Sequence, residues 1–173
     1  MKTARAARAR AAPLSAMQLL VLDVDGVLTD GRLQYDASGE VGKSFHVRDG
    51  YGIKALLAAG IDVAVISGRR SAAVLHRCEE LGIRHVLLGI DDKAAALKGL
   101  LEVLELKAAQ CTCVGDDAPD VPMLQQAGLA VAVADAHPVA CAVAHRRTRQ
   151  PGGAGAVREV CDWLLAARPS GRR

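Results

Sequence analysis

The sequence predicts an α/β protein, with a Rossmann-like three-layer fold, a mainly parallel sheet, a β-hairpin flap and no cap domain. Short apolar runs alternate along the chain with amphipathic helical segments, and short loops join them. Such alternation places parallel strands in the middle and helices on both faces. The 173 residues suit one domain. Their composition, 51% hydrophobic but only 2% aromatic, predicts an aliphatic core between helices and a buried sheet.

Apolar runs bounded by turn residues predict five strands, at residues 18–22, 61–66, 85–88, 111–115 and 129–133. Capping residues and glycines predict helices from Asp49 to Gly60, from Ser71 to Gly82 and from Asp92 to Leu106. A further helix is expected to end near Gly128, and the last helix to cover residues 157–165. Residues 32–35 and 43–47 flank the turn-rich stretch 36–42 and predict the hairpin. A weaker helix-and-strand region follows Pro138.

The net charge of +3 arises at the two ends of the chain. Seven of the 22 basic residues lie there without any acid: Lys2, Arg5, Arg8, Arg10, Arg168, Arg172 and Arg173. The body that remains has 15 basic against 19 acidic residues, and its lack of aromatic side chains for stacking argues against a nucleic-acid partner. We expect a domain at residues 17–167, a basic disordered tail at 1–16 and a basic tail at 168–173.

No apolar run approaches the length that crosses a bilayer, and the basic leader lacks the apolar stretch of a secretory signal. The five cysteines are an odd number and form no CxxC pair. We therefore expect buried reduced thiols, with Cys111 and Cys113 on one face of a strand, in a cytoplasmic protein without a membrane partner.

Side chains that can carry phosphate chemistry follow four successive predicted strands. Asp23 and Asp25 follow the first, Ser67 the second, Lys93 the third and Asp116 the fourth. Ligands of parallel α/β folds bind at the carboxyl ends of the strands. Each residue alone has an ordinary explanation, such as a turn or a helix cap. Together, in this order, they predict one phosphate site.

Phosphate monoesters hydrolyse so slowly that enzymes accelerate the reaction by up to ~10²¹, of which general acid catalysis contributes only ~10²–10⁴. A carboxylate nucleophile also repels the dianionic substrate, so the site needs a divalent cation and fixed donors. Mg²⁺ prefers carboxylate and water oxygens and fits Asp23 with Asp116. Lys93 supplies charge, Ser67 a hydroxyl, and the amides after Asp23 an anion-binding nest. Asp25 is expected to protonate the leaving oxygen and later to accept a proton from water.

Four motifs resemble the ordered motifs of the haloacid dehalogenase superfamily: DVDGVLTDG, VISGR, the lysine of GIDDK, and VGDDAPD. The resemblance implies that Asp23 is the nucleophile, forming an aspartyl-phosphate, and that Asp25 is the acid/base. It also implies that the backbone carbonyl of Asp25 reaches the metal ion beside Asp23 and Asp116. Roles for Asp117 and Asp120 stay open, including orientation of the metal's waters.

Residues 17–165 further resemble the 3-deoxy-D-manno-octulosonate 8-phosphate phosphatases through FHVRDGYGIKAL, SGRRSAAVLHRCEELGI, VAVADAHP and GAVREVCD. This resemblance implies a magnesium-dependent phosphatase of lipopolysaccharide precursor synthesis that releases the free sugar acid and inorganic phosphate. It implies substrate contacts at Asp25, His46, Val47, Arg48, Asp49, Gly50, Lys54, Arg69, Arg77 and Lys93. An anionic sugar acid needs such additional cations, and Arg69, which adjoins Ser67 at a strand end, is the best placed.

Two alternatives stay open. Related capless phosphatases that act on nine-carbon keto sugar acid phosphates share most of these segments. A receiver-like phospho-acceptor domain also uses Asp, Mg²⁺ and Lys on an α/β sheet. Its Asp normally lies on the third strand, whereas Asp23 follows the first, and a slow switch needs no acid/base such as Asp25.

The spacing of the motifs leaves no room for a cap, because the roughly 40 residues from Asp25 to Ser67 and the roughly 20 from Lys93 to Asp116 are too few for an independent core. Phosphoryl transfer benefits from a site that excludes water, and an isolated hairpin is marginal in water. Pairing of the hairpin at 32–47 with copies in neighbouring subunits would meet both needs, and the resemblance implies a tetramer assembled in this way. We expect a homotetramer in which residues 152–155 help to wall the pocket.

Overall fold

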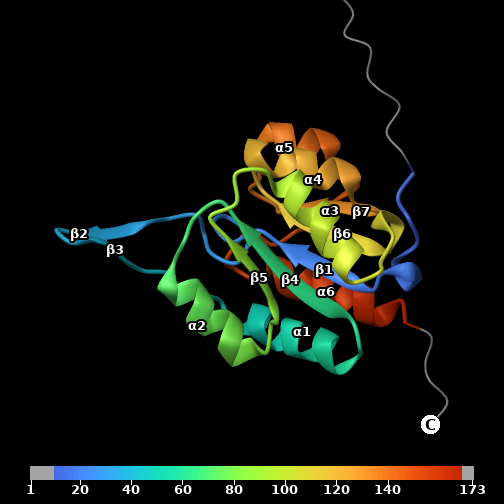
Figure 1. Cartoon of the computed structure of the whole chain (residues 1–173), viewed down its shortest axis with the longest axis horizontal. Coiled ribbons are helices and arrows are strands. Elements are labelled where there is room, and N and C mark those ends of the chain that lie inside the picture. Colours follow the sequence, from blue (N-terminus) through green and yellow to red (C-terminus); the bar gives the residue numbers. More distant parts are fainter. Residues whose placement is uncertain (1–9, 169–173) are drawn as a thin grey trace, which may run out of the picture.

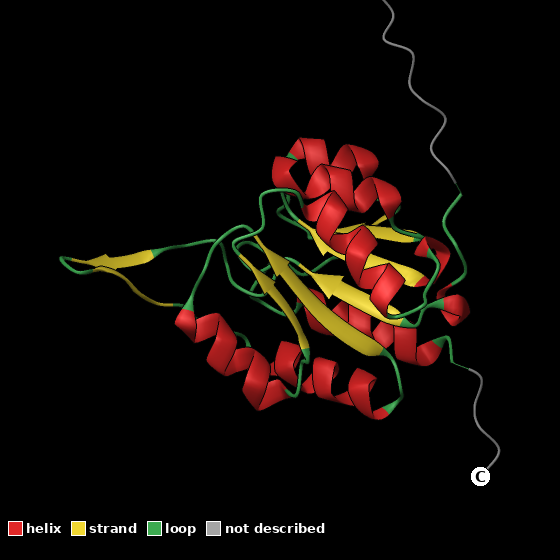
Figure 2. Ribbon diagram, in the orientation of Figure 1, coloured by secondary structure: helices red, strands yellow, loops and turns green. Residues whose placement is uncertain are grey.

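The fold is built on a six-stranded parallel sheet, in a computed structural model that describes residues 10–168 (Figures 1 and 2). The strand order is β5-β4-β1-β6-β7-β8. The strands are β1 (Leu19–Leu22), β4 (Asp62–Ser67), β5 (His85–Leu88), β6 (Cys111–Gly115), β7 (Leu129–Ala132) and β8 (Arg146–Arg147). All four residues of β1 are buried because the strand pairs on both sides and is covered on both faces.

Helices cover both faces of this sheet. They are α1 (Val47–Ala58), α2 (Ala72–Leu81), α3 (Lys93–Val103), α4 (Val121–Gln126), α5 (Pro138–Val143) and α6 (Ala156–Ala166). Figure 1 shows α1, α2 and α6 on one face and α3, α4 and α5 on the other. This arrangement confirms the predicted three-layer α/β fold. Among residues 10–168, no helix is long and apolar enough to span a membrane.

Aliphatic side chains fill the core, as the composition predicted. Ile53 and Leu56 of α1 and Val160 and Leu164 of α6 are fully buried between these two helices and the sheet. All five cysteines are free thiols, and four of them are buried. The Sγ atoms of Cys111 and Cys113 lie 3.6 Å apart, so the two side chains share a face of β6 as expected.

A two-stranded antiparallel hairpin projects from the body (Figure 1). Its strands are β2 (Gln34–Asp36) and β3 (Gly39–Gly42). The hairpin was predicted, but the assignment of its second strand to residues 43–47 was wrong. The turn is tight because the Asp36 carboxylate accepts the amide of Ser38 at 2.7 Å, which brings the chain back at Gly39.

The start of α1 also differs from the expectation. His46 is the N-cap, with its Nδ1 accepting the amide of Arg48 at 3.2 Å. Asp49 lies in the first turn, where its Oδ1 accepts the amide of Arg158 in α6 at 2.7 Å. The Asp49 carboxyl therefore ties the start of α1 to the start of α6 instead of capping α1. Burial raises the pKa of this carboxyl.

Part of the expected basic tail belongs to the fold. Leu14–Ala16 form a 3₁₀ turn, and the amide of Ala12 donates to the carbonyl of Gly128 at 2.9 Å. Ordered structure therefore begins before residue 17. The rest of the two expected tails, residues 1–9 and 169–173, lies outside the described residues.

Candidate active site

Side chains from four strand ends meet at the carboxyl edge of the sheet, where the sequence placed them. Asp23 follows β1, Ser67 ends β4, Lys93 begins α3 after β5, and Asp116 follows β6. Because β1 lies between β4 and β6, the loops after these strands are neighbours. The cavity among them has a volume of about 460 Å³, and its lining also includes Asp25, Arg69, Asp117 and Asp120.

Lys93 joins two buried acids. Its Nζ lies 2.6 Å from Asp23 Oδ1 and 2.6 Å from Asp120 Oδ1. The side chain of Lys93 is 5% exposed, that of Asp23 is 8% exposed and that of Asp120 is 2% exposed. Burial lowers the pKa of Lys93, but the two carboxylates outweigh it and raise the pKa. The ammonium therefore stays charged and holds Asp23 in place.

The site holds more negative charge than Lys93 neutralises. Oxygens of Asp23, Asp116 and Asp120 all lie within 4.8 Å of one another. Burial and then repulsion from Asp120 raise the pKa of Asp23 to about 6. Burial and then repulsion from Asp23 and Asp120 raise the pKa of Asp116 to about 8. Three carboxylates facing one ammonium fit a hard divalent cation, which would relieve their repulsion.

Asp120, whose role the sequence left open, is engaged by protein groups at both carboxylate oxygens. Oδ1 accepts Lys93, and Oδ2 accepts the amides of Asp116 at 2.8 Å and Asp117 at 3.3 Å. Gly115 permits this approach, because a Cβ there would lie 2.5 Å from the Asp120 Cβ. The Asp117 carboxylate accepts the amide of Ala118 at 2.7 Å and caps the following 3₁₀ turn.

The loop after Asp23 turns sharply. The amides of Val27, Leu28 and Thr29 all donate to the carbonyl of Val24, at 3.2, 2.9 and 3.0 Å. These three amides are engaged within the loop, so the predicted anion-binding nest must draw on amides closer to Asp23.

The glycine-rich segment at 152–155 packs against this loop of its own chain. The amide of Gly153 donates to the carbonyl of Val27 at 3.0 Å, and that of Gly152 donates to Asp135 Oδ1 at 2.9 Å. A Cβ at Gly152 would collide with the carbonyl of Gly26. Within one subunit the segment therefore supports the Asp23 loop.

Asp25 faces two cations. Lys43 Nζ donates to its Oδ1 at 2.5 Å, and Arg69 Nε lies 3.8 Å from its Oδ2. Arg69 also donates to the Tyr35 hydroxyl at 2.7 Å. Of these, Arg69 was predicted, whereas Lys43 and Tyr35 were missed. They belong to the hairpin region, and local sequence patterns do not predict where that region lies relative to the sheet.

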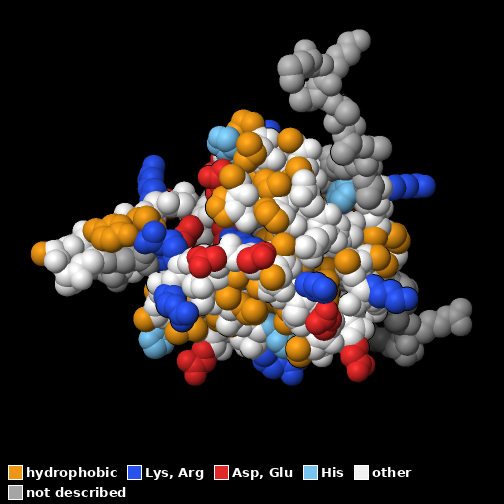
Figure 3. All heavy atoms as spheres, turned by 45° about the horizontal axis from the view of Figure 1, so that its top comes forward, with side chains coloured by type: hydrophobic (Ala, Val, Ile, Leu, Met, Phe, Trp, Pro, Cys, Tyr) orange, Lys and Arg blue, Asp and Glu red, His pale blue; other side chains and the backbone are white. Residues whose placement is uncertain are grey.

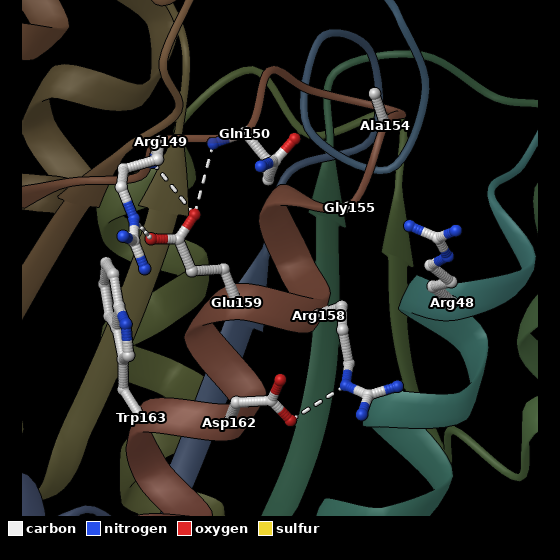
Figure 4. A pocket seen from close by; sticks show the side chains of 9 residues that line it. All are labelled: Arg48, Arg149, Gln150, Ala154, Gly155, Arg158, Glu159, Asp162 and Trp163. Atoms are coloured by element: carbon white, nitrogen blue, oxygen red, sulfur yellow. Dashed lines mark hydrogen bonds and ion pairs between the residues drawn. The ribbon is translucent and has the colours of Figure 1, made fainter.

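The predicted substrate residues of α1 do not line the acidic cavity. Residues 46–50 form the first turn of that helix and its cap, and Lys54 is exposed further along it. Arg48 instead lines a second cavity, of about 470 Å³, whose other lining residues come from α6 and from the segment at 149–155 before it. Figure 4 shows Arg48 and Arg158 extending into it from the two facing helices, with Arg158 paired to Asp162 at 2.8 Å.

Arg77 also lies apart from the acidic cavity within the subunit. Its guanidinium pairs with Glu80 at 2.8 Å and lies 6.0 Å from the centroid of the Phe45 ring. It lines a further cavity between α2 and residues 43–47, together with Lys43. Of the additional cations that the sequence proposed for the sugar acid, Arg69 is thus the one that the fold brings to the acids.

Comparisons with known proteins agree with this fold. Residues 87–157 match the haloacid dehalogenase-like hydrolase family. The 3-deoxy-D-manno-octulosonate 8-phosphate phosphatases KdsC of Yersinia pestis and Escherichia coli (strain K12) are each 49% identical over 152 residues, covering 88% of this chain and 81% of the relative.

Solved structures extend the similarity. The 3-deoxy-D-manno-octulosonate 8-phosphate phosphatase of Moraxella catarrhalis, in complex with a magnesium ion, a phosphate ion and a KDO molecule, is 42% identical with a TM-score of 0.87, covering 90% of this chain and 89% of that chain. The cobalt-bound phosphatase of Haemophilus influenzae is 44% identical with a TM-score of 0.88, covering 90% and 91%.

The fold and the acidic site at the strand ends define a haloacid dehalogenase-like hydrolase. Within that class, the chain belongs to the family of 3-deoxy-D-manno-octulosonate 8-phosphate phosphatases.

Proposed function

We propose that this chain is a cytoplasmic, Mg²⁺-dependent phosphatase that hydrolyses 3-deoxy-D-manno-octulosonate 8-phosphate to the free sugar acid and inorganic phosphate, a step of lipopolysaccharide precursor synthesis. The observation that carries the proposal is Asp23, held by Lys93 beside Asp116, with Asp25 in the same cavity. Relatives at 49% identity bear the name of this activity.

The residues that would hold Mg²⁺ are Asp23, Asp116 and the backbone carbonyl of Asp25. Asp116 suits this role because Asp120, the third acid of the cluster, already accepts Lys93 and two amides. When bound, Mg²⁺ supplies positive charge that offsets repulsion between these carboxylates and the phosphate.

In the first step, an Asp23 oxygen attacks phosphorus while the bond between phosphorus and the sugar oxygen breaks. Asp25 donates a proton to that sugar oxygen. Lys93 and the Ser67 hydroxyl stabilise the phosphoryl oxygens, and Lys93 keeps Asp23 aligned through the 2.6 Å contact.

In the second step, water attacks the phosphorus of phospho-Asp23. Asp25, now ionised, takes a proton from the water, and the bond to the Asp23 oxygen breaks to release inorganic phosphate. The carboxylate of Asp23 and the protonated Asp25 are restored, so no further reactant is needed.

Arg69 supports a sugar acid as the substrate, because its guanidinium is half-exposed at the edge of the cavity, where it can meet a carboxylate. Such a contact also suits a nine-carbon keto sugar acid phosphate. We favour the eight-carbon substrate on the names of the relatives. Asp25 in the cavity favours an enzyme over a phospho-acceptor switch.

We further propose a homotetramer as the working unit. The projecting hairpin exposes apolar side chains, with Leu33 39% and Tyr35 60% exposed, and Figure 3 shows hydrophobic atoms along this projection. Val47 and Tyr51 of α1 are also exposed, at 77% and 66%. Exposed apolar groups on a marginal hairpin suit contact with another subunit.

The direct test measures phosphate release from a panel of sugar phosphates with Mg²⁺ and again with a chelator. We expect the eight-carbon sugar acid phosphate to have the highest kcat/KM and the chelator to abolish turnover. Asp23→Asn should reduce kcat by at least about 10³-fold while the fold is kept. Asp62→Asn, at the opposite edge of the sheet, is the matched control. Substantial activity of Asp23→Asn with normal Mg²⁺ dependence contradicts the proposal.

A further inference from the structure

Lys43 is a buried lysine that the mechanism above does not use. It follows β3 at the base of the hairpin, and its side chain is only 1% exposed. A lysine ammonium is strongly hydrated and is almost never fully buried unless it is paired. Its Nζ donates to Asp25 Oδ1 at 2.5 Å, across 18 residues of sequence. The burial of Lys43 is therefore offset in part by the side chain proposed as the acid/base.

The two oxygens of Asp25 have different surroundings. Oδ1 accepts a hydrogen bond from Lys43, which lines the cavity between α2 and residues 43–47 rather than the acidic cavity. Oδ2 faces Arg69, which does line the acidic cavity. A carboxylate that is held at one oxygen by a buried partner cannot rotate freely. The contact from Lys43 therefore keeps Oδ2 directed toward the acidic cavity, where the substrate would bind.

We propose, on the basis of the function proposed above, that Lys43 is a positioning residue that holds Asp25 with Oδ2 directed at the reacting oxygen. In the first step, Oδ2 gives its proton to the sugar oxygen as the bond from that oxygen to phosphorus breaks. In the second step, the same Oδ2 takes a proton from the attacking water. Lys43 touches neither the substrate nor the phosphorus and acts through Asp25.

A purely structural role, in which Lys43 only anchors the hairpin, predicts different kinetics. An anchor would affect all substrates and both steps alike. A positioning residue acts only where Asp25 moves a proton. The first step with an aryl phosphate needs little protonation of the leaving group, whereas hydrolysis of phospho-Asp23 needs the base for every substrate.

Lys43→Met tests this difference, because it keeps the length of the side chain and removes the charge. With the eight-carbon sugar acid phosphate, we expect kcat to fall about 10²-fold, the loss typical of a misplaced reacting group, and KM to change little. With p-nitrophenyl phosphate, release of the first equivalent of p-nitrophenol should stay fast while steady turnover falls. The result is a burst of about one equivalent per site, larger than in the wild type.

A double-mutant cycle with Asp25→Asn provides the decisive comparison. If Lys43 acts through Asp25, then Lys43→Met in the Asp25→Asn background should cause little further loss. Losses that multiply, or equal losses on both substrates without a burst, overturn the inference. Arg32→Ala is the matched control, because it removes an 88% exposed cation near the hairpin and should leave turnover unchanged.

Folding and function are separated by two further measurements. Circular dichroism establishes that each variant is folded, and if Lys43→Met is not, Lys43→Gln goes through the same cycle with the same expected outcomes. A wild type that releases no phosphate from any substrate with Mg²⁺ overturns the proposed function. An active wild type with multiplying losses overturns only the role of Lys43.

Discussion

At the scale of single residues, Gly26 connects the nucleophile loop to the acid after β6. Its φ is 91°, and a Cβ at this position would collide with the Asp116 carboxylate. Gly26→Ala should therefore lower the free energy of unfolding by about 1–3 kcal/mol through backbone strain. It should also weaken Mg²⁺ binding, because Asp116 has to move. Thermal unfolding should show a Tm lower by about 2–4 °C per kcal/mol and a smaller rise on adding Mg²⁺.

Gly60→Ala separates the two effects. Gly60 also has a positive φ, of 74°, but a Cβ there would meet no atom within 4 Å. The control should lose stability through backbone strain alone and keep the full response to Mg²⁺. An equal Mg²⁺ response in Gly26→Ala and the wild type would contradict the proposed use of Asp116.

Residues placed by strand ends could be predicted from the sequence, whereas residues placed by loops could not. Asp23, Ser67 and Asp116 each follow an apolar run, and parallel strands necessarily bring such positions to one edge. Lys43 follows a short hairpin, and no periodicity indicates that its ammonium turns back to Asp25. The role of Asp120 was hidden for a related reason, because its contacts depend on the turn after Gly115.

At the scale of elements, the hairpin meets the acidic site through Tyr35 of β2 as well as through Lys43. The hydroxyl of Tyr35 accepts from Arg69 at 2.7 Å. Tyr35→Phe removes this acceptor and should loosen Arg69. Because the bond is exposed, we expect its loss to cost about 0.5–1.5 kcal/mol, or a roughly 2- to 10-fold higher KM for the sugar acid phosphate. Steady-state kinetics should show an unchanged KM for p-nitrophenyl phosphate, which has no carboxylate.

Gln34→Ala is the control for this prediction, because Gln34 is the exposed neighbour in the same strand. It should leave both KM values unchanged. A rise in KM for both substrates in Tyr35→Phe would assign Arg69 to the phosphate rather than to the sugar acid.

Elements of the sheet and its covering helices were predicted closely, and the region between β1 and α1 was not. Buried parallel strands read as continuous apolar runs, which set their limits within a residue or two. Between residues 32 and 50, by contrast, a side-chain contact in the turn sets the position of β3, and a histidine cap sets the start of α1. Such local bonds compete with propensity and shift boundaries by several residues.

At the scale of the whole molecule, the open acidic cavity and the exposed apolar hairpin both indicate contact with another subunit. A subunit without a cap leaves the cavity open, and several residues that the family resemblance assigns to the substrate, among them Arg48 and Arg77, lie outside that cavity. A neighbouring subunit that packs against the hairpin could bring its own copies of such residues to the site. The proposed tetramer therefore bears on substrate recognition as well as on stability.

Leu33→Asp tests this assembly by placing a charge beside β2, where burial against another subunit would be costly. In size exclusion with light scattering, we expect the wild type to have the mass of four chains and the variant a lower mass. Turnover of the sugar acid phosphate should fall with the mass, whereas turnover of p-nitrophenyl phosphate should be partly spared. Val103→Asp, at the far end of α3 and 77% exposed, is the matched control and should remain tetrameric. A wild type that is fully active as a monomer at assay concentration would refute the assembly argument, because the acids of one chain would then suffice.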